Sequence, residues 1–163
     1  MVAVGTYELS LFLHIAAAVV GFGATFAMAI AFPLALRMDP RHLPYVHRLS
    51  LRLSQYFILP AVVVILATGF YQVAEGNWEL ADFWLSAAIA IVVVLALLTI
   101  AYFIPADRRL EAMVQREIDA GGPGEVSLSD DYRRQAQREG GIGAFTGVLV
   151  LVVVYLMVDK PGL

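Results

Sequence analysis

Four long apolar runs constrain this chain more than any other feature of its sequence. They cover residues 9–36, 56–74, 83–104 and 142–158. A hydrocarbon layer of about 30 Å needs roughly 20 apolar residues in an α-helix, because each residue advances by about 1.5 Å. The composition agrees, since 60% of the residues are hydrophobic and only 15% are charged. We therefore expect an integral membrane protein.

The runs predict an all-α fold, with residues 1–163 forming one transmembrane domain. We expect a four-helix bundle with helices at about 7–36, 46–75, 82–104 and 130–159. Proline lacks a backbone N–H, so Pro105 is expected to end the third helix. Residues 105–129 should then form a cytoplasmic loop that contains an amphipathic helix. The first run is expected to be retained, because no basic residue precedes it as in a cleaved signal.

The positions of the basic residues predict the orientation. Ten of the eleven Lys and Arg residues lie between the first and second runs or between the third and fourth. Because Lys and Arg are retained in cytoplasmic loops, both termini should lie outside. The connection 75–82 should also lie outside, with Trp78 and Trp84 at the membrane interface.

His14 is the most informative single residue, because it interrupts the apolar stretch "LSLFLHIAAAVVGFG". At about 1.5 Å per residue, His14 and Thr68 both lie about 10 Å below the outer edge of their helices. Tyr71, Gln72 and Tyr155 lie somewhat nearer the outer surface. A buried imidazole without a partner is costly in hydrocarbon. We therefore predict an outer-leaflet polar pocket around His14, with Thr68, Tyr71, Gln72 and Tyr155 as its walls.

Two roles for His14 remain open. It could tie helices together by a hydrogen bond to Thr68, Gln72 or Tyr155. Alternatively, it could be a metal ligand. The iron of haem b is the first candidate metal and copper is the second. No second ligand is evident, since His42 and His47 belong to the cytoplasmic end, where we expect ordinary interface residues.

Several functional classes lack the residues that they require. The central part of each run contains no Asp, Glu or Lys, so a carboxylate proton relay has no evident carrier. The chain has no cysteine, no phosphate-binding loop and no zinc-protease motif. Its arginines are placed to orient the protein in the membrane, which gives no support for nucleic-acid binding.

These features favour a small membrane binding or accessory protein without evident catalytic machinery. The first alternative is a haem b-binding redox protein, similar to a porphyrin or quinol oxidase. The second is a structural subunit of a larger membrane complex. Membrane lipid is the expected partner, and a homo-oligomer or larger complex would use the small residues on the first and fourth helices.

Several segments resemble an uncharacterised bacterial family of predicted integral membrane proteins with a domain of unknown function. They are "LFLHIAAAVVGFG", "FILPAVVVILATGFYQV", "GNWELADFWL" and "IPADRRL", and the likeness covers most of the chain. The resemblance implies a multi-pass protein of the bacterial cytoplasmic (inner) membrane. A looser similarity extends to CopD-type copper-resistance domains and HemJ-type protoporphyrinogen oxidases, which also have an early intramembrane histidine. HemJ-type enzymes use an intramembrane lysine, whereas Lys160 here follows the fourth run.

Overall fold

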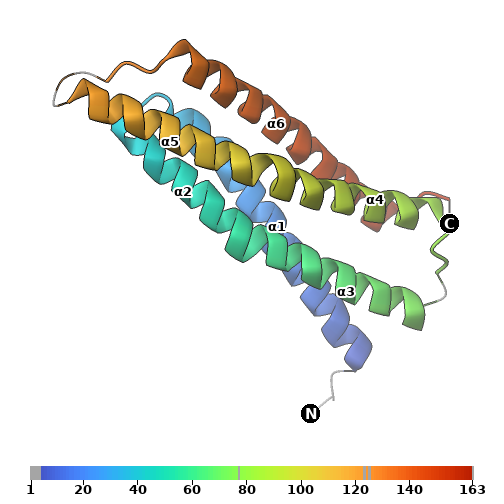
Figure 1. Cartoon of the computed structure of the whole chain (residues 1–163). Coiled ribbons are helices and arrows are strands. Elements are labelled where there is room, and N and C mark those ends of the chain that lie inside the picture. The colour runs from blue at the N-terminus through green and yellow to red at the C-terminus, as the bar shows by residue number, and fades with distance from the viewer. Residues whose placement is uncertain (1–4, 77, 123, 125, 163) are drawn as a thin grey trace.

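The chain folds into a bundle of four long helical rods. A computed structural model describes residues 5–76, 78–122, 124 and 126–162. Within these residues every regular element is helical. Four rods of 30, 36, 39 and 30 residues are long and apolar enough to cross a membrane, and they lie alongside one another (Figure 1). The predicted all-α, four-helix membrane bundle is confirmed.

Two of the rods are single helices and two are interrupted by short irregular turns. The first rod is α1 (Thr6–Ala35) and the fourth is α6 (Asp130–Asp159). The second rod comprises η1 (Pro40–His42), α2 (Leu43–Leu53), η2 (Ser54–Ile58) and α3 (Leu59–Glu75). The third comprises α4 (Phe83–Leu98), η3 (Thr99–Phe103) and α5 (Ile104–Gly121). Helix α1 packs on α3, α2 on α5 and α4 on α6.

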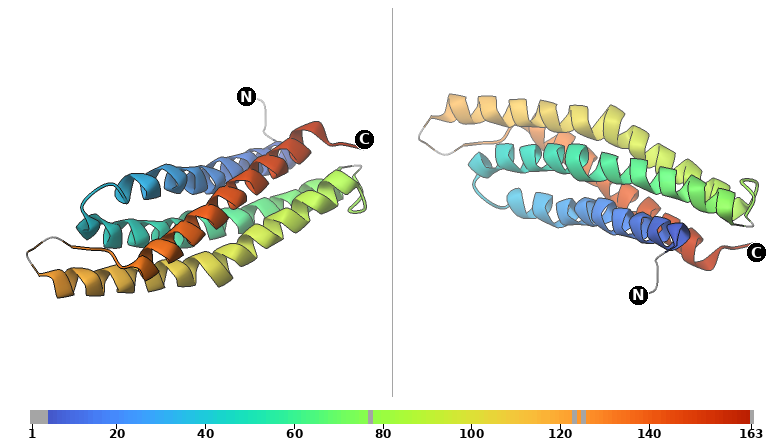
Figure 2. Two further views of the ribbon diagram at one scale, coloured as in Figure 1. Left: turned by 90° about the horizontal axis from the view of Figure 1, so that it is seen from above. Right: turned by 90° about the horizontal axis from the view of Figure 1, so that it is seen from below.

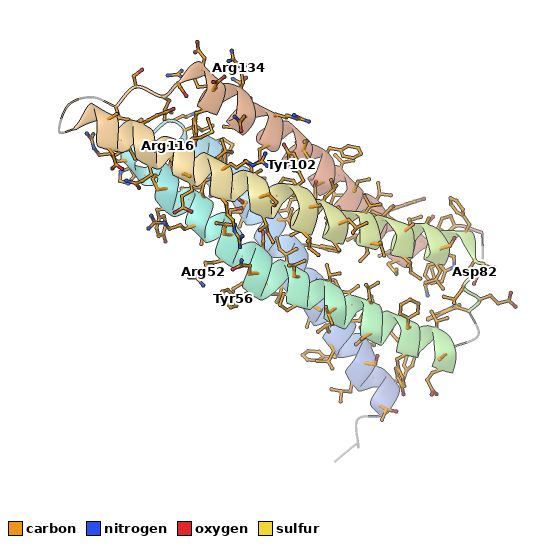
Figure 3. All side chains as sticks on the ribbon, in the orientation of Figure 1. Arg52, Tyr56, Asp82, Tyr102, Arg116 and Arg134 are labelled. Atoms are coloured by element: carbon orange, nitrogen blue, oxygen red, sulfur yellow. The ribbon has the colours of Figure 1, made fainter. Side chains whose placement is uncertain are left out.

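The two ends of the bundle differ in charge. The C-terminal ends of α1 and α5 and the starts of the second rod and of α6 lie at one end, and the helix ends nearest the two termini lie at the other (Figures 1 and 2). We call the first the arginine end, where Arg116 and Arg134 lie (Figure 3). We call the second the tryptophan end, since Trp78 and Trp84 flank its connection. That the arginine end faces the cytoplasm remains a prediction.

The segment after Pro105 differs from the expectation of a loop with a separate helix. Residues 104–121 form α5, which continues α4 and η3 without a break. In η3 the Ile104 N–H bonds to the Thr99 carbonyl, five residues back. This wider π-helical turn accommodates the proline ring, which would otherwise clash with a carbonyl one turn earlier. The same device precedes Pro60, where the Leu59 N–H bonds to the Ser54 carbonyl.

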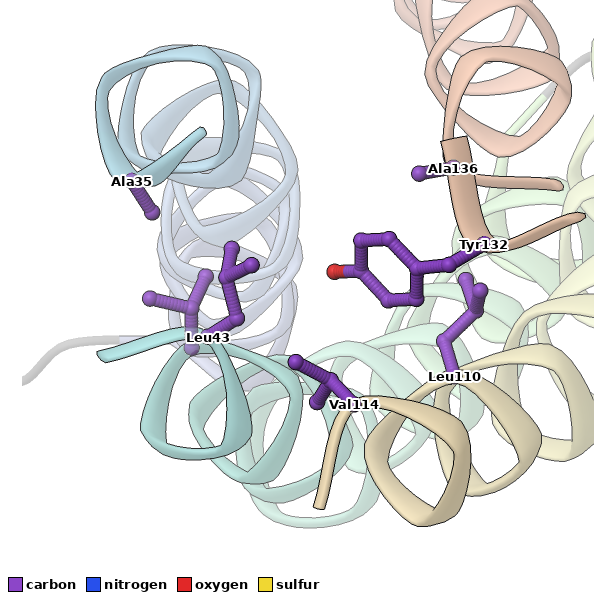
Figure 4. Close-up of a cluster of buried hydrophobic side chains, with 7 residues drawn as sticks. Ala35, Leu43, Leu110, Val114, Tyr132 and Ala136 are labelled. Atoms are coloured by element: carbon purple, nitrogen blue, oxygen red, sulfur yellow. The ribbon is translucent and has the colours of Figure 1, made fainter. Parts of the chain in front are cut away.

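Continuing the helix gives the apolar face of α5 a protein partner. Leu110 and Val114 are almost completely buried, and they pack with side chains from α1, α2 and α6 at the arginine end (Figure 4). Tyr132 of α6 points into the same cluster. The residues of this arginine-end core are Ala35, Leu43, Val46, Leu110, Val114, Tyr132 and Ala136. The bundle therefore has a second packed region beyond the apolar part of the third run.

Most apolar side chains of the rods point outward. Only 11–22% of the residues in the most apolar window of each rod are buried within the protein. In water such surfaces would be costly, whereas lipid solvates them. The outward faces therefore match a bilayer environment.

Helices α1 and α3 are in close contact at Gly21. A Cβ atom placed on Gly21 would lie 2.7 Å from the Cβ of Ala61, whereas one on Gly23 would meet nothing within 4 Å. We expect Gly21→Ala to lower the free energy of unfolding by about 1–3 kcal/mol, because the helices must separate. The matched variant Gly23→Ala should be neutral or stabilising, by up to about 1 kcal/mol. Thermal unfolding of both variants in detergent measures the difference, and equal stabilities would contradict this packing.

Candidate functional site

His14 contacts Thr68 at the interface of α1 and α3. The distance from His14 Nδ1 to Thr68 Oγ1 is 2.9 Å. The Thr68 hydroxyl donates its one hydrogen to the Val64 carbonyl, at 2.6 Å. It can therefore only accept from His14, so Nδ1 carries the ring proton. The other ring nitrogen, Nε2, keeps its lone pair, and no hydrogen bond of the described residues uses it.

Three of the predicted pocket residues lie on α3 at this interface. Besides Thr68, Gln72 is buried, and its Nε2 donates to Ser10 Oγ at 3.5 Å. The Ser10 hydroxyl donates to the Thr68 carbonyl at 3.4 Å. Tyr71 lies further toward the tryptophan end, where its hydroxyl donates to Thr6 Oγ1 at 3.1 Å. A polar track thus joins α1 and α3 over several turns.

A small cavity lies beside His14, and its walls are mainly apolar. Its volume is about 30 Å³, and its lining includes Gly69, Leu85, Val92 and Met157. A Cβ on Gly69 would come within 3.3 Å of His14 Cε1, so glycine leaves room for the ring. We call this space the His14 cavity. It is large enough for a water-sized group.

Tyr155 lies apart from the His14 cavity. Its side chain is exposed, and its hydroxyl donates to Asp159 Oδ2 on the same helix at 2.7 Å. Tyr155 lies at a height in the bundle similar to that of the other predicted wall residues, but its side chain faces away from the bundle. The other predicted wall residues, Thr68, Tyr71 and Gln72, do not line the cavity either, and the α6 residue that lines it is Met157.

A second polar cluster is buried at the arginine end. His47 of α2, Asp107 of α5 and Glu139 of α6 are 0%, 0% and 8% exposed. His47 Nδ1 lies 2.8 Å from Asp107 Oδ1, and His47 Nε2 lies 2.9 Å from the Tyr132 hydroxyl. An ionised carboxylate only accepts, so Nδ1 donates to Asp107 and Nε2 accepts from Tyr132. The His47 ring also packs edge-on against Phe32, with centroids 5.1 Å apart.

Glu139 is the third residue of this cluster, and at least one of its two carboxylate oxygens has no hydrogen-bond partner among the described residues. One potential ligand atom each from His47, Asp107 and Glu139 lies within 4.8 Å of the others. Asp107 Oδ2 and Glu139 Oε2 are buried and have no hydrogen-bond partner within the described part of the chain. No arginine or lysine among the described residues forms an ion pair with either carboxylate. The arrangement can hold a proton or a cation between oxygens.

At the arginine end, Arg41 ties the start of the second rod to the segment that follows α5. Arg41 donates from Nη2 to the carbonyls of Gly122 and Gly124, at 2.9 and 2.7 Å. Asp39 accepts from the Arg41 backbone N–H at 2.9 Å. That hydrogen bond lowers the pKa of the exposed Asp39 carboxyl.

Sequence reasoning missed this cluster because its carboxylates lie in strongly charged segments. The helical spacing between each carboxylate and the buried residues of its helix is a signal that could have identified the cluster. Asp107 lies three and seven residues before the buried Leu110 and Val114. Glu139 lies three and seven residues after the buried Ala136 and Tyr132. An acidic residue at such a position shares the buried face of its helix.

Comparison with known proteins identifies the family. No curated protein and no solved structure matches the chain, so the looser similarity to CopD-type and HemJ-type domains gains no support. The family model described as "Predicted integral membrane protein (DUF2269)" matches residues 8–161. That range includes His14 and all four rods except the first two residues of α1. The chain therefore belongs to the DUF2269 family of predicted integral membrane proteins.

Proposed function

We propose that this multi-pass membrane protein is a non-catalytic binding protein whose ligand is held at Nε2 of His14. One observation carries the proposal. The imidazole lies in an apolar span with Nδ1 bonded to Thr68, the hydrogen bonds of the described residues include none to Nε2, and the ring lines a small cavity. An unpaired polar atom in hydrocarbon is costly. A ligand that donates a hydrogen bond to Nε2 removes that cost.

The surroundings of His14 favour an apolar ligand with a hydroxyl group. The cavity walls are mainly apolar and carry no charged side chain. His14 is half-buried, so a molecule dissolved in the bilayer can reach it from the lipid side. The cavity volume of about 30 Å³ admits the hydroxyl, while the rest of the ligand lies along the outer apolar faces. A quinol is a suitable test ligand of this class.

Quinol binding tests the proposal. A short-tailed ubiquinol analogue, titrated into the detergent-purified protein, should bind saturably. We expect His14→Leu to weaken binding by about tenfold, since one hydrogen bond contributes roughly 1–1.5 kcal/mol. Ser86→Ala, at an exposed position on α4, serves as the control and should bind as the unaltered chain does. Equal affinity of the His14→Leu variant would refute the proposal.

The alternative proposal is that His14 binds the iron of haem b in a redox protein similar to a porphyrin or quinol oxidase. Copper is the other metal proposed to bind His14. A porphyrin is far larger than the His14 cavity, so its ring would have to lie on the lipid side of the helices. The absorption spectrum of the purified protein distinguishes the proposals. A Soret band that is lost in His14→Ala would favour haem.

We further infer that the protein resides in a bacterial cytoplasmic membrane with its arginine end inside, on the strength of the positive-inside rule. Membrane lipid is its first proposed partner. A structural role in a homo-oligomer or larger complex is supported by Gly140, Gly141 and Gly143 of α6, since a Cβ at each would meet nothing within 4 Å.

A further inference from the structure

The buried cluster at the arginine end holds two carboxylates that form no ion pair with a lysine or arginine of the described residues. Asp107 and Glu139 together carry two negative charges when both are ionised, and His47 is neutral when it accepts from Tyr132. One oxygen of each carboxylate has no partner, although both residues are more than nine-tenths buried. Buried charges are normally paired, or they bind a metal ion. A divalent cation would neutralise both.

We propose that His47, Asp107 and Glu139 form a binding site for a first-row divalent cation such as Zn²⁺ or Mn²⁺. This site is separate from the His14 cavity and does not depend on its function. The three side chains come from α2, α5 and α6, so they converge from three sides. Their ligand atoms lie within 4.8 Å of one another. In a tetrahedral site with bonds of about 2.0 Å the ligand atoms are about 3.3 Å apart, so small side-chain movements suffice.

The donor atoms indicate the class of cation. Imidazole nitrogen combined with carboxylate oxygen suits zinc and other first-row divalent ions. Calcium and magnesium prefer oxygen ligands alone. Three protein ligands also leave a coordination position for water, as in open zinc sites.

Tyr132 is placed to orient the histidine when the cation binds. The cation takes the place of the proton between His47 Nδ1 and Asp107 Oδ1. These two atoms are 2.8 Å apart in this structure, before a cation binds. The ring proton then resides on Nε2, and Nε2–H donates to the Tyr132 hydroxyl, 2.9 Å away. Metal-binding histidines usually donate their second N–H to such a partner. Tyr132 would thus be a positioning residue rather than a ligand.

The experiment is a titration of the chelator-stripped, detergent-purified full chain with Zn²⁺ and, separately, with Mn²⁺. We expect one tightly bound ion per chain for at least one of the two metals. Glu139→Gln preserves the size of the side chain and should weaken binding at least about 100-fold, because it removes a ligand and a charge. Glu75→Gln, exposed at the tryptophan end, controls for surface binding, and His14→Ala separates this site from the His14 cavity. Both controls should retain full affinity.

Three results would overturn the proposal. They are the absence of stoichiometric binding of either metal, unchanged affinity in Glu139→Gln, and loss of binding in His14→Ala. X-ray absorption of the loaded protein adds a readout that does not depend on variants. We expect nitrogen and oxygen neighbours at about 2.0–2.2 Å. A sulfur neighbour at about 2.3 Å would place the ion elsewhere, since no sulfur-containing residue belongs to the cluster.

Discussion

Replacing His47 by alanine is expected to lower the free energy of unfolding of the metal-free protein by about 3–5 kcal/mol. The ring is completely buried, and both of its nitrogens are hydrogen-bonded. Its removal leaves Asp107 Oδ1 and the Tyr132 hydroxyl without a partner and opens a cavity against Phe32. Thermal or denaturant unfolding in detergent measures the loss.

His42→Ala is the matched control for this prediction. His42 lies five residues earlier and is exposed, so its replacement should change the stability by less than about 0.5 kcal/mol. If both alanine variants unfolded at the same temperature as the unaltered protein, the hydrogen-bonded network would contribute nothing, and our description of the arginine end would be wrong.

Replacing Trp84 by alanine should destabilise the opposite end by a similar amount, about 3–5 kcal/mol. Trp84 is 3% exposed and packs against side chains of α3, α4 and α6. Its ring lies edge-on to Trp78, with centroids 5.8 Å apart, and the Lys160 ammonium lies 5.5 Å from its centroid. Circular dichroism during heating in detergent measures the effect.

The neighbouring residue provides the comparison for Trp84. Phe83 is 70% exposed, so detergent already solvates its ring and Phe83→Ala should cost little. If Trp84→Ala and Phe83→Ala lowered the stability by the same amount, the effect would arise from helix α4 itself and not from the packing of Trp84.

The apolar runs suffice to predict the number and positions of the rods, because membrane thickness fixes the length of a spanning helix. They cannot predict that the third helix passes through Pro105. A proline usually ends or kinks a helix, and here the outcome depends on the π-helical turn at Thr99–Phe103. Beyond that turn α5 packs against α2, a contact that is not visible in the local sequence.

The residues around His14 show what helical height can and cannot predict. Counting residues places His14 and Thr68 at the same depth, and their side chains are 2.9 Å apart. The same counting also selected Tyr155, which faces outward. Height follows from the rise per residue, whereas the direction of a side chain also depends on how its helix is rotated against its neighbours. The cluster of His47, Asp107 and Glu139 was missed for a related reason, since three separate helices bring it together.

The central claim is that His14 presents an open acceptor nitrogen to a ligand, and ¹⁵N nuclear magnetic resonance of histidine-labelled protein tests it most directly. The chain has three histidines, so single variants assign the signals. We predict that His14 carries its proton on Nδ1 at neutral pH, and that the Nε2 resonance shifts when a quinol is added. A His14 ring protonated on Nε2, or an Nε2 resonance unchanged at saturating quinol, would contradict the account.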